Sequence, residues 1–133
     1  EKPLLAQAPE DLFSLGRVYE KRGKIEGARV CYRAADQGAV SALARARMAD
    51  SFRREGDFAQ AAQIYDRMIG ARQGGVAPLV AMAKISEHKL RDIPRAIEYT
   101  RKAIILAAEE PEAPLAALQK RYQRLLYKAR RDS

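Results

Sequence analysis

The sequence predicts an all-α fold, and three observations support this prediction. Ala, Leu, Arg, Glu and Lys dominate the 133 residues while β-branched residues are scarce, a mixture that favours helix. Hydrophobic residues make up 47% of the chain, which is enough for one domain with a packed core. A pattern of small and aromatic residues also recurs about every 34 residues, which is typical of stacked helix pairs.

The repeated pattern is clearest in the segment "LGRVYEKRGKIEGARVCYRAA". Its spaced residues are Leu15, Gly16, Tyr19, Gly23, Ala28, Tyr32 and Ala35. The same spacing returns in Met48, Ala49, Phe52, Gly56, Ala61, Tyr65 and Met68. A third copy keeps Ala83, Ala96 and Ala103, with Tyr99 one residue early, Glu87 in place of the first aromatic and Arg91 in place of the turn glycine. The positions of Ala28, Ala61 and Ala96 give periods of 33 and 35 residues.

This spacing predicts how two antiparallel helices pack against each other. The small residues let the two backbones approach closely, and the leucines and aromatic residues fill the space beside them. Gly23 and Gly56 end the first helix of their pairs in a conformation that glycine adopts at little cost. We therefore interpret the pattern as the residues through which the helices pack and not as a catalytic site.

Local signals place seven helices in order along the chain. Pro9, Glu10 and Asp11 begin the first, because proline suits a first turn and acids stabilise its positive end. The second helix is expected at Ile25 to about Gln37, and the third at Val40–Arg54 with Ser41 near its start as a candidate cap. Asp57 caps the fourth, which ends before "ARQGG", where Gly74 and Gly75 form a flexible joint. The fifth runs from Pro78 to about Leu90, the sixth starts at Asp92 and ends before "EEPEAP", and the seventh covers about Pro114–Arg130.

The seventh helix is expected to cover the end of the helix stack. One of its faces is apolar, and its other faces are polar and basic. The apolar stripe consists of Leu115, Leu118, Tyr122, Leu125 and Leu126. A stacked array of helix pairs needs a terminal element of this kind, with one face to bury and one to show to water.

The repeated residues resemble those of the tetratricopeptide repeat family. The resemblance implies a right-handed α-solenoid of three helix-turn-helix repeats, at about 9–38, 41–71 and 77–107, with a capping helix at about 113–130, all in a single domain over 1–133. The segments "AMAKISEHKLRDIPRAIEYTRKAI" and "LQKRYQRLLYKAR" also resemble the C-terminal repeat tail of bacterial proteins that carry an upstream ribonuclease H-like exonuclease domain. That resemblance implies that the chain is a portion of a longer protein and that any nuclease activity belongs to the other portion.

The sequence contains no recognisable catalytic set, so we expect that it is not an enzyme and binds no cofactor or metal. Cys31 is the single cysteine and His88 the single histidine, which leaves no multi-cysteine or zinc pattern. We expect Cys31 to be buried and His88 to be exposed on a helix. The lone cysteine suits a reducing compartment, and neither a signal peptide nor a membrane-spanning run is apparent, so a cytoplasmic location without membrane binding is expected.

The family resemblance implies that the first helix of each repeat lines a concave groove. Carried over position by position, the groove residues are Phe13, Arg17, Glu20, Lys21, Ala46, Asp50, Arg53, Arg54, Ala81, Ile85, His88 and Lys89. Basic residues recur at equivalent places in all three repeats, at Lys21, Arg54 and Lys89. They suit an acidic ligand, and the alternative is that they are hydrated charges near helix ends, where cations are also favourable.

Two functions follow from these features. The favoured one is a protein-interaction module that binds an acidic partner segment, or its own upstream domain, in the basic groove. The alternative is a nucleic-acid-binding accessory to an attached nuclease, since the chain carries a net charge of +8 and residues 112–133 contribute +4 of it. The candidate contacts for an anionic partner or nucleic acid are Lys120, Arg121, Arg124, Lys128, Arg130 and Arg131. The oligomeric state stays open.

Overall fold

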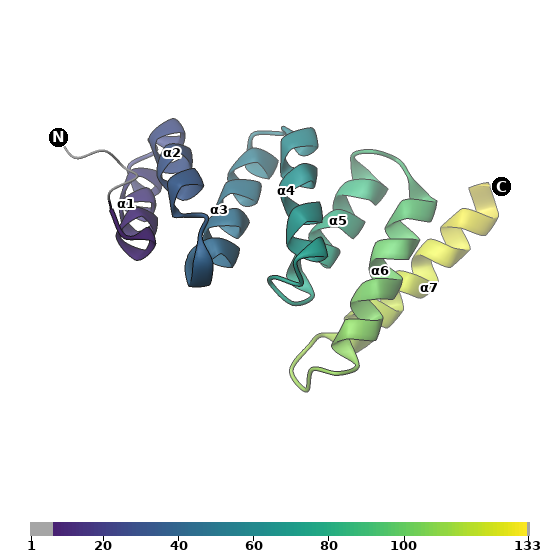
Figure 1. Ribbon diagram of the computed structural model, residues 1–133. Helices are drawn as coiled ribbons and strands as arrows, with labels where there is room; N and C mark the ends of the chain where they lie inside the picture. The colour runs from purple at the N-terminus through teal and green to yellow at the C-terminus, as the bar shows by residue number, and fades with distance from the viewer. Residues whose placement is uncertain (1–6, 133) are drawn as a thin grey trace. The chain divides into compact units, whose positions relative to one another are not determined.

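The computed structural model describes residues 7–132, and this part of the chain is all-helical, as predicted. It contains seven α-helices and one short 3-10 helix, and no strand (Figure 1). The helices are α1 (Pro9–Lys21), α2 (Ile25–Ala35), α3 (Ser41–Arg54), α4 (Phe58–Gly70), α5 (Ala77–His88), α6 (Ile93–Ala107) and α7 (Leu115–Asp132), with the 3-10 helix η2 (Gly38–Val40) before α3.

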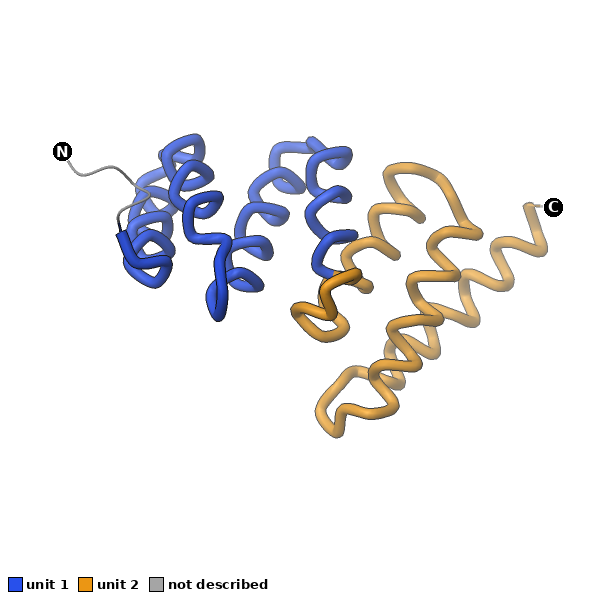
Figure 2. The backbone as a smooth tube through the Cα atoms, in the orientation of Figure 1, with its two compact units in different colours: residues 1–68 blue, residues 69–133 orange. Residues whose placement is uncertain are grey.

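The helices form two compact units, residues 1–68 and 69–133 (Figure 2). In the first unit α1 packs on α2 and α2 packs on α3. In the second unit α5 packs on α6 and α6 packs on α7. The division falls inside α4, between Met68 and Ile69. It therefore does not coincide with the glycine joint at Gly74 and Gly75.

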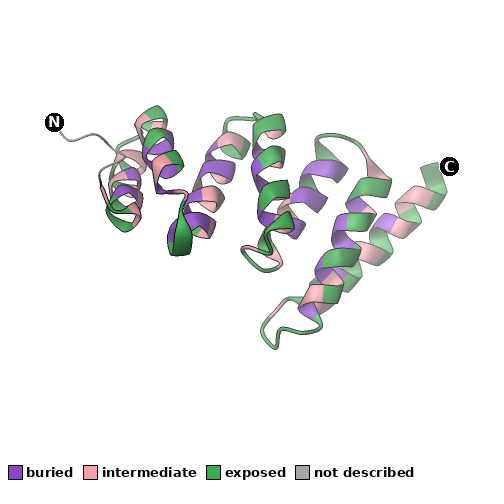
Figure 3. Ribbon diagram, viewed as in Figure 1, coloured by how far each residue is buried: buried purple, intermediate pink, exposed green. Residues whose placement is uncertain are grey.

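Each unit has its own core, which contains the small residues that recur in the sequence together with larger apolar residues (Figure 3). The buried residues of the first unit include Leu12, Gly16, Ala28, Cys31, Tyr32, Ala35, Ala49, Ala61, Tyr65 and Met68. Those of the second include Leu79, Met82, Ala83, Ala96, Tyr99, Ala103, Leu118 and Leu125. The alanines are 0–2% exposed, which is the close helix approach that the spacing predicts.

The turn inside each helix pair uses a left-handed residue at the same repeat position. Gly23 has φ 74° and Gly56 has φ 84°, and the amide after each donates to the carbonyl five residues before it, at 2.9 Å. These contacts are typical of a Schellman turn that ends a helix. Arg91, which replaces the glycine in the third copy, also has a positive φ, of 54°. The turn geometry is thus kept although its preferred residue is lost.

Several predicted helix limits are confirmed and others need correction. Asp92 caps α6 by accepting a hydrogen bond from the Arg95 amide at 3.1 Å, and Asp57 accepts one from the Gln60 amide at 3.2 Å. The prediction that Ser41 caps α3 is wrong, because its hydroxyl donates instead to the Asp36 carboxylate.

Four helices have limits that differ from the predicted ones, and α3 begins at Ser41 and not at Val40. The second ends at Ala35 and not at Gln37, since the backbone becomes extended there. The fifth ends at His88 and not at Leu90, because the chain turns into the left-handed residue at Arg91. The seventh begins and ends one to two residues later than predicted, at Leu115 and Asp132.

Candidate functional site

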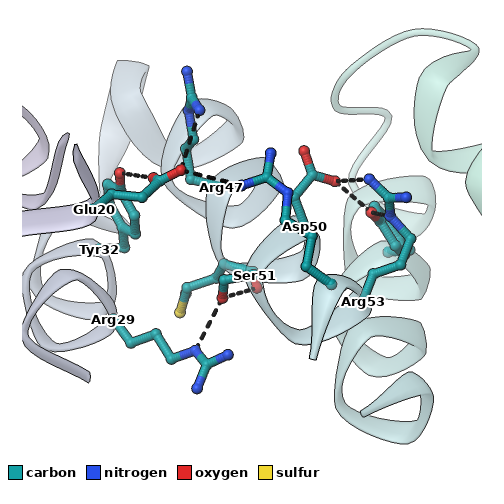
Figure 4. A network of polar contacts seen from close by, with 10 residues as sticks. Glu20, Arg29, Tyr32, Arg47, Asp50, Ser51 and Arg53 are labelled. Carbon is teal, nitrogen blue, oxygen red and sulfur yellow. Dashed lines mark hydrogen bonds and ion pairs between the residues drawn. The ribbon is translucent and has the colours of Figure 1, made fainter. Parts of the chain in front are cut away.

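Four of the predicted groove residues, Glu20, Asp50, Arg53 and Arg54, belong to a polar network in the first unit that includes two buried tyrosines (Figure 4). We call it the tyrosine–carboxylate network. Its members are Glu20 from α1, Tyr32 from α2, Arg47, Asp50, Arg53 and Arg54 from α3, and Tyr65 from α4. Each of the two tyrosines joins the second helix of a pair to the first.

The first centre of the network is Glu20. Its Oε1 atom accepts a hydrogen bond from the Tyr32 hydroxyl at 2.5 Å, and its side chain is 14% exposed. The other carboxylate oxygen lies 3.4 Å from Nη1 of Arg47 and 3.6 Å from Nη1 of Arg54. Burial raises the pKa of Tyr32, and the bond to Glu20 raises it further because a phenolate beside a carboxylate is unfavourable. The Tyr32 hydroxyl therefore stays protonated and keeps donating to the carboxylate.

The second centre, Asp50, repeats this arrangement on α3 and α4. Its Oδ1 atom accepts a hydrogen bond from the Tyr65 hydroxyl at 2.6 Å, and Nη2 of Arg53 lies 3.5 Å away. The Nε atom of Arg53 donates to the Tyr65 oxygen at 3.3 Å. Burial, followed by the hydrogen bond to Asp50, raises the pKa of Tyr65 to about 12. The two helix pairs of the first unit therefore use the same tyrosine-to-carboxylate contact.

The third copy of the pattern lacks this contact. Thr100 stands 35 residues after Tyr65, and its buried hydroxyl donates to the Ala96 carbonyl at 2.8 Å. His88 is exposed, as predicted, and its Nε2 atom lies 3.4 Å from Oε1 of Glu87. Lys89 is exposed and Ile85 is 3% exposed, so Ile85 offers almost no surface to a partner. The network is therefore confined to the first unit, and His88 and Lys89 do not belong to it.

The remaining predicted groove cations of the first unit have different surroundings. Lys21 is exposed, Arg17 is partly buried, and the structure records no hydrogen bond or ion pair for either among the described residues. Arg17 still lies close enough to Tyr32 for its charge to oppose the rise in the tyrosine pKa. Arg53 and Arg54 are 44% and 61% exposed in their side chains, so their guanidinium groups reach solvent.

Two arginines of the first unit, Arg47 and Arg29, were not predicted from the sequence as site residues. Arg47 pairs with Glu20, a residue 27 positions away. Arg29 is buried: Nε donates to the Ser51 hydroxyl at 2.9 Å, and the guanidinium lies 3.9 Å from the centre of the Phe52 ring. It also forms 2.9 Å ion pairs with Glu26 and Glu55. The only signal of its burial is its place beside Ala28 and three residues before Tyr32, on the buried face of α2, and this signal is weak for a charged residue.

The predicted anion contacts of the C-terminal helix separate into two sets. Arg121, Arg124 and Lys128 are turned toward Glu87, whose side chain is 0% exposed. Arg124 contacts both carboxylate oxygens, and its Nη2 atom donates to Oε1 at 2.9 Å. The bond from Arg124 lowers the pKa of Glu87 to about 2 despite the burial of the carboxylate. Glu87 is the residue that replaces an aromatic in the third copy, so this position anchors α7 by an ionic contact.

The second set comprises Lys120, Arg130 and Arg131, which are exposed. Arg131 has a 3.4 Å contact with the neighbouring Asp132. Tyr127, on the same helix, is 63% exposed.

Within residues 7–132 no group of three or more His, Cys, Asp or Glu side chains is placed to hold a metal ion. None of the described helices is long and apolar enough to cross a membrane. Cys31 is 2% exposed, and burial raises the pKa of its thiol. A comparison with protein-family models finds no match, and a comparison with curated proteins finds none either.

Proposed function

We propose that the chain is a tetratricopeptide-like interaction module that binds an acidic polypeptide segment at the arginines of the tyrosine–carboxylate network, together with Arg17 and Lys21 of α1. The repeated spacing and the recurring left-handed turns at Gly23, Gly56 and Arg91 support the family assignment. An array of such helix pairs is a common scaffold for extended binding surfaces. The segment comes from a separate protein or from an upstream domain of the same protein.

The observation that carries the proposal is the unequal strength of the contacts within the network. Glu20 and Asp50 are held by short bonds from tyrosines, at 2.5 and 2.6 Å. The arginines contact the same carboxylates only at 3.4–3.6 Å and are partly exposed. Exposed ion pairs of this kind contribute about 0–1 kcal/mol each. A partner carboxylate that pairs with these guanidinium groups therefore replaces only weak ion pairs, and the loss of those ion pairs costs little free energy.

The chemistry of the arginines defines the partner. A guanidinium group offers a planar fork that matches a carboxylate, so two or three neighbouring arginines favour a run of Asp or Glu side chains. Arg17 and Lys21 add two cations on α1 that have no recorded ion pair among the described residues. Cations thus outnumber carboxylates on this surface, although Glu20 and Asp50 lie within it.

The test is binding of a fluorescein-labelled glutamate-rich peptide of about twelve residues, followed by anisotropy. We expect saturable binding that the combined substitution Arg17→Gln, Arg53→Gln and Arg54→Gln weakens at least tenfold. The control is Arg33→Gln with Arg67→Gln, which removes two exposed arginines from α2 and α4 that lie outside the network. Equal loss in both variants, or no loss in the first, refutes the assignment of the binding surface.

A further inference from the structure

The outward surface of α7 combines cations with an exposed aromatic ring. Counting from Lys120, the residues that follow at steps of three or four along α7 are exposed. We call the surface that they form the α7 outer face. It consists of Lys120, Gln123, Arg124, Tyr127, Arg130 and Arg131. Spacings of three and four place residues on one side of an α-helix, so these six side chains share a single face.

The α7 outer face carries Lys or Arg side chains along its whole length, of which Arg124 pairs with Glu87 and Arg131 with Asp132. It holds four Lys or Arg side chains and no Asp or Glu. The rise of 1.5 Å per residue spreads these cations over about 16 Å of helix. Arg124 is bound to Glu87 yet its side chain remains 48% exposed. Lys120 has no recorded hydrogen bond or ion pair among the described residues, so its charge is not neutralised locally.

Tyr127 lies in the middle of these cations. It is 63% exposed, and the structure records no ring contact or hydrogen bond for it among residues 7–132. Contact between an aromatic ring and water is unfavourable, so a partner that covers the ring gains binding free energy. Tyr122, the other aromatic residue of α7, is partly buried. Tyr127 is therefore the ring of this helix that is open to an external ligand.

We propose that the α7 outer face binds single-stranded nucleic acid, with Tyr127 stacking on a base and the flanking cations contacting phosphates. Single strands are bound by this combination of an aromatic platform and a basic track, because an unpaired base exposes its ring face. A duplex keeps its bases stacked and offers Tyr127 no such surface. A membrane surface fits poorly, because the apolar residues Leu118 and Leu125 of α7 are buried and the outer face carries one aromatic ring.

The proposal is independent of the acidic-peptide site on α1 and α3, since it concerns a different helix, ligand and set of residues. Anisotropy titrations with the full 133-residue chain use a labelled twelve-nucleotide oligothymidine and an abasic strand of the same length. Both probes carry the same phosphates, and only the first carries bases. We expect the oligothymidine to bind about tenfold more tightly than the abasic strand, as one stacked base would provide.

Three variants identify the residues. Tyr127→Ala should weaken oligothymidine binding about tenfold and leave abasic binding unchanged, whereas Tyr127→Phe should retain the stacking and the affinity. Lys120→Gln should reduce the salt dependence by about 0.7 in the slope of log K against log salt, the value for one phosphate of a single strand. Circular dichroism confirms that each variant stays helical.

The matched control is Arg53→Gln with Arg54→Gln, which removes two exposed cations from the peptide site. This control should leave oligothymidine binding intact, and the α7 variants should leave peptide binding intact. Failure of the nucleic-acid proposal can therefore be distinguished from failure of the peptide proposal. Equal affinity for the two strands with no effect of Tyr127→Ala overturns the proposal, because the face then recognises only negative charge. Absence of binding at 50 mM salt, or an equal loss in the control variant, also overturns it.

Discussion

The packing of Tyr32 over Gly16 gives a sharp test of the first helix pair. A Cβ atom at position 16 would lie 2.6 Å from Cε1 and 2.8 Å from Cδ1 of Tyr32. Normal contacts between carbon atoms are about 3.5–4.0 Å, so the ring must move by about 1 Å. Tyr32 is 1% exposed and its hydroxyl is bound to Glu20, so the ring has little freedom to move. Gly16→Ala should therefore destabilise the first unit.

The magnitude follows from two opposing effects. Alanine favours helix over glycine by about 1 kcal/mol. Overpacking a tight site costs about 1–3 kcal/mol, and weakening a hydrogen bond to a charged group costs about 1.5–3 kcal/mol. We expect the steric effect to dominate and the free energy of unfolding to fall by about 2 kcal/mol. For a chain of this length that corresponds to a decrease in Tm of roughly 6–10 °C.

The assay is urea and thermal unfolding followed by circular dichroism at 222 nm. Gly27→Ala is the matched control, since Gly27 is also inside a helix but its added Cβ would meet the Tyr19 ring at an ordinary 3.5 Å. This control should be stabilised by up to about 1 kcal/mol. If Gly16→Ala is as stable as Gly27→Ala, the close contact between α1 and α2 at Tyr32 is refuted.

Three further predictions concern other parts of the molecule. Glu87 has its pKa lowered from 4.5 to about 2, so its contacts stabilise the fold above pH 4.5 and the stabilisation is lost as the pH falls toward 2. Glu87→Gln should lower the free energy of unfolding at pH 7 by about 3 kcal/mol and make it less dependent on pH between 2 and 4.5. Urea titrations between pH 2 and 6 measure this dependence, and the same dependence in the variant as in the original chain would contradict the ionic contact. Arg91→Gly should stabilise the chain by about 1 kcal/mol, because glycine adopts the positive φ of 54° without the steric strain that a Cβ atom causes. Chemical denaturation measures the free energy of unfolding, and a decrease in the variant would contradict this prediction. Cys31 should react with a thiol reagent such as dithionitrobenzoate only after unfolding in urea, and rapid labelling of the native protein would show that it is accessible.

The helix content and many of the helix ends were predictable because their causes are local. Gly23 and Gly56 end helices, and Asp57 and Asp92 begin them, through contacts within six residues. The buried alanines were predictable too, since a recurring spacing identifies the face that a helix buries. The prediction for Ser41 failed because a competing acceptor, the Asp36 carboxylate, lies five residues before it.

The candidate site was only partly predictable. Arg53, Arg54, Glu20 and Asp50 were selected by their repeat positions, but their pairing with tyrosines of the neighbouring helices was not. From the sequence, six cations of the C-terminal helix are predicted to contact an external anion. In the structure three of them contact the Glu87 carboxylate, and Lys120, Arg130 and Arg131 remain on the surface.

By itself, the sequence determined the helical class, the repeat period and the buried faces, because helix propensity, end signals and apolar spacing act over a few residues. The tertiary structure alone decided which charges are paired. Glu20 meets Arg47 across 27 residues and Glu87 meets Arg124 across 37, and neither separation is visible as a pattern. The physical reason is that two opposite charges pair only where the folded chain brings them within a few ångströms of each other. Whether it does so depends on how neighbouring helices are rotated against one another.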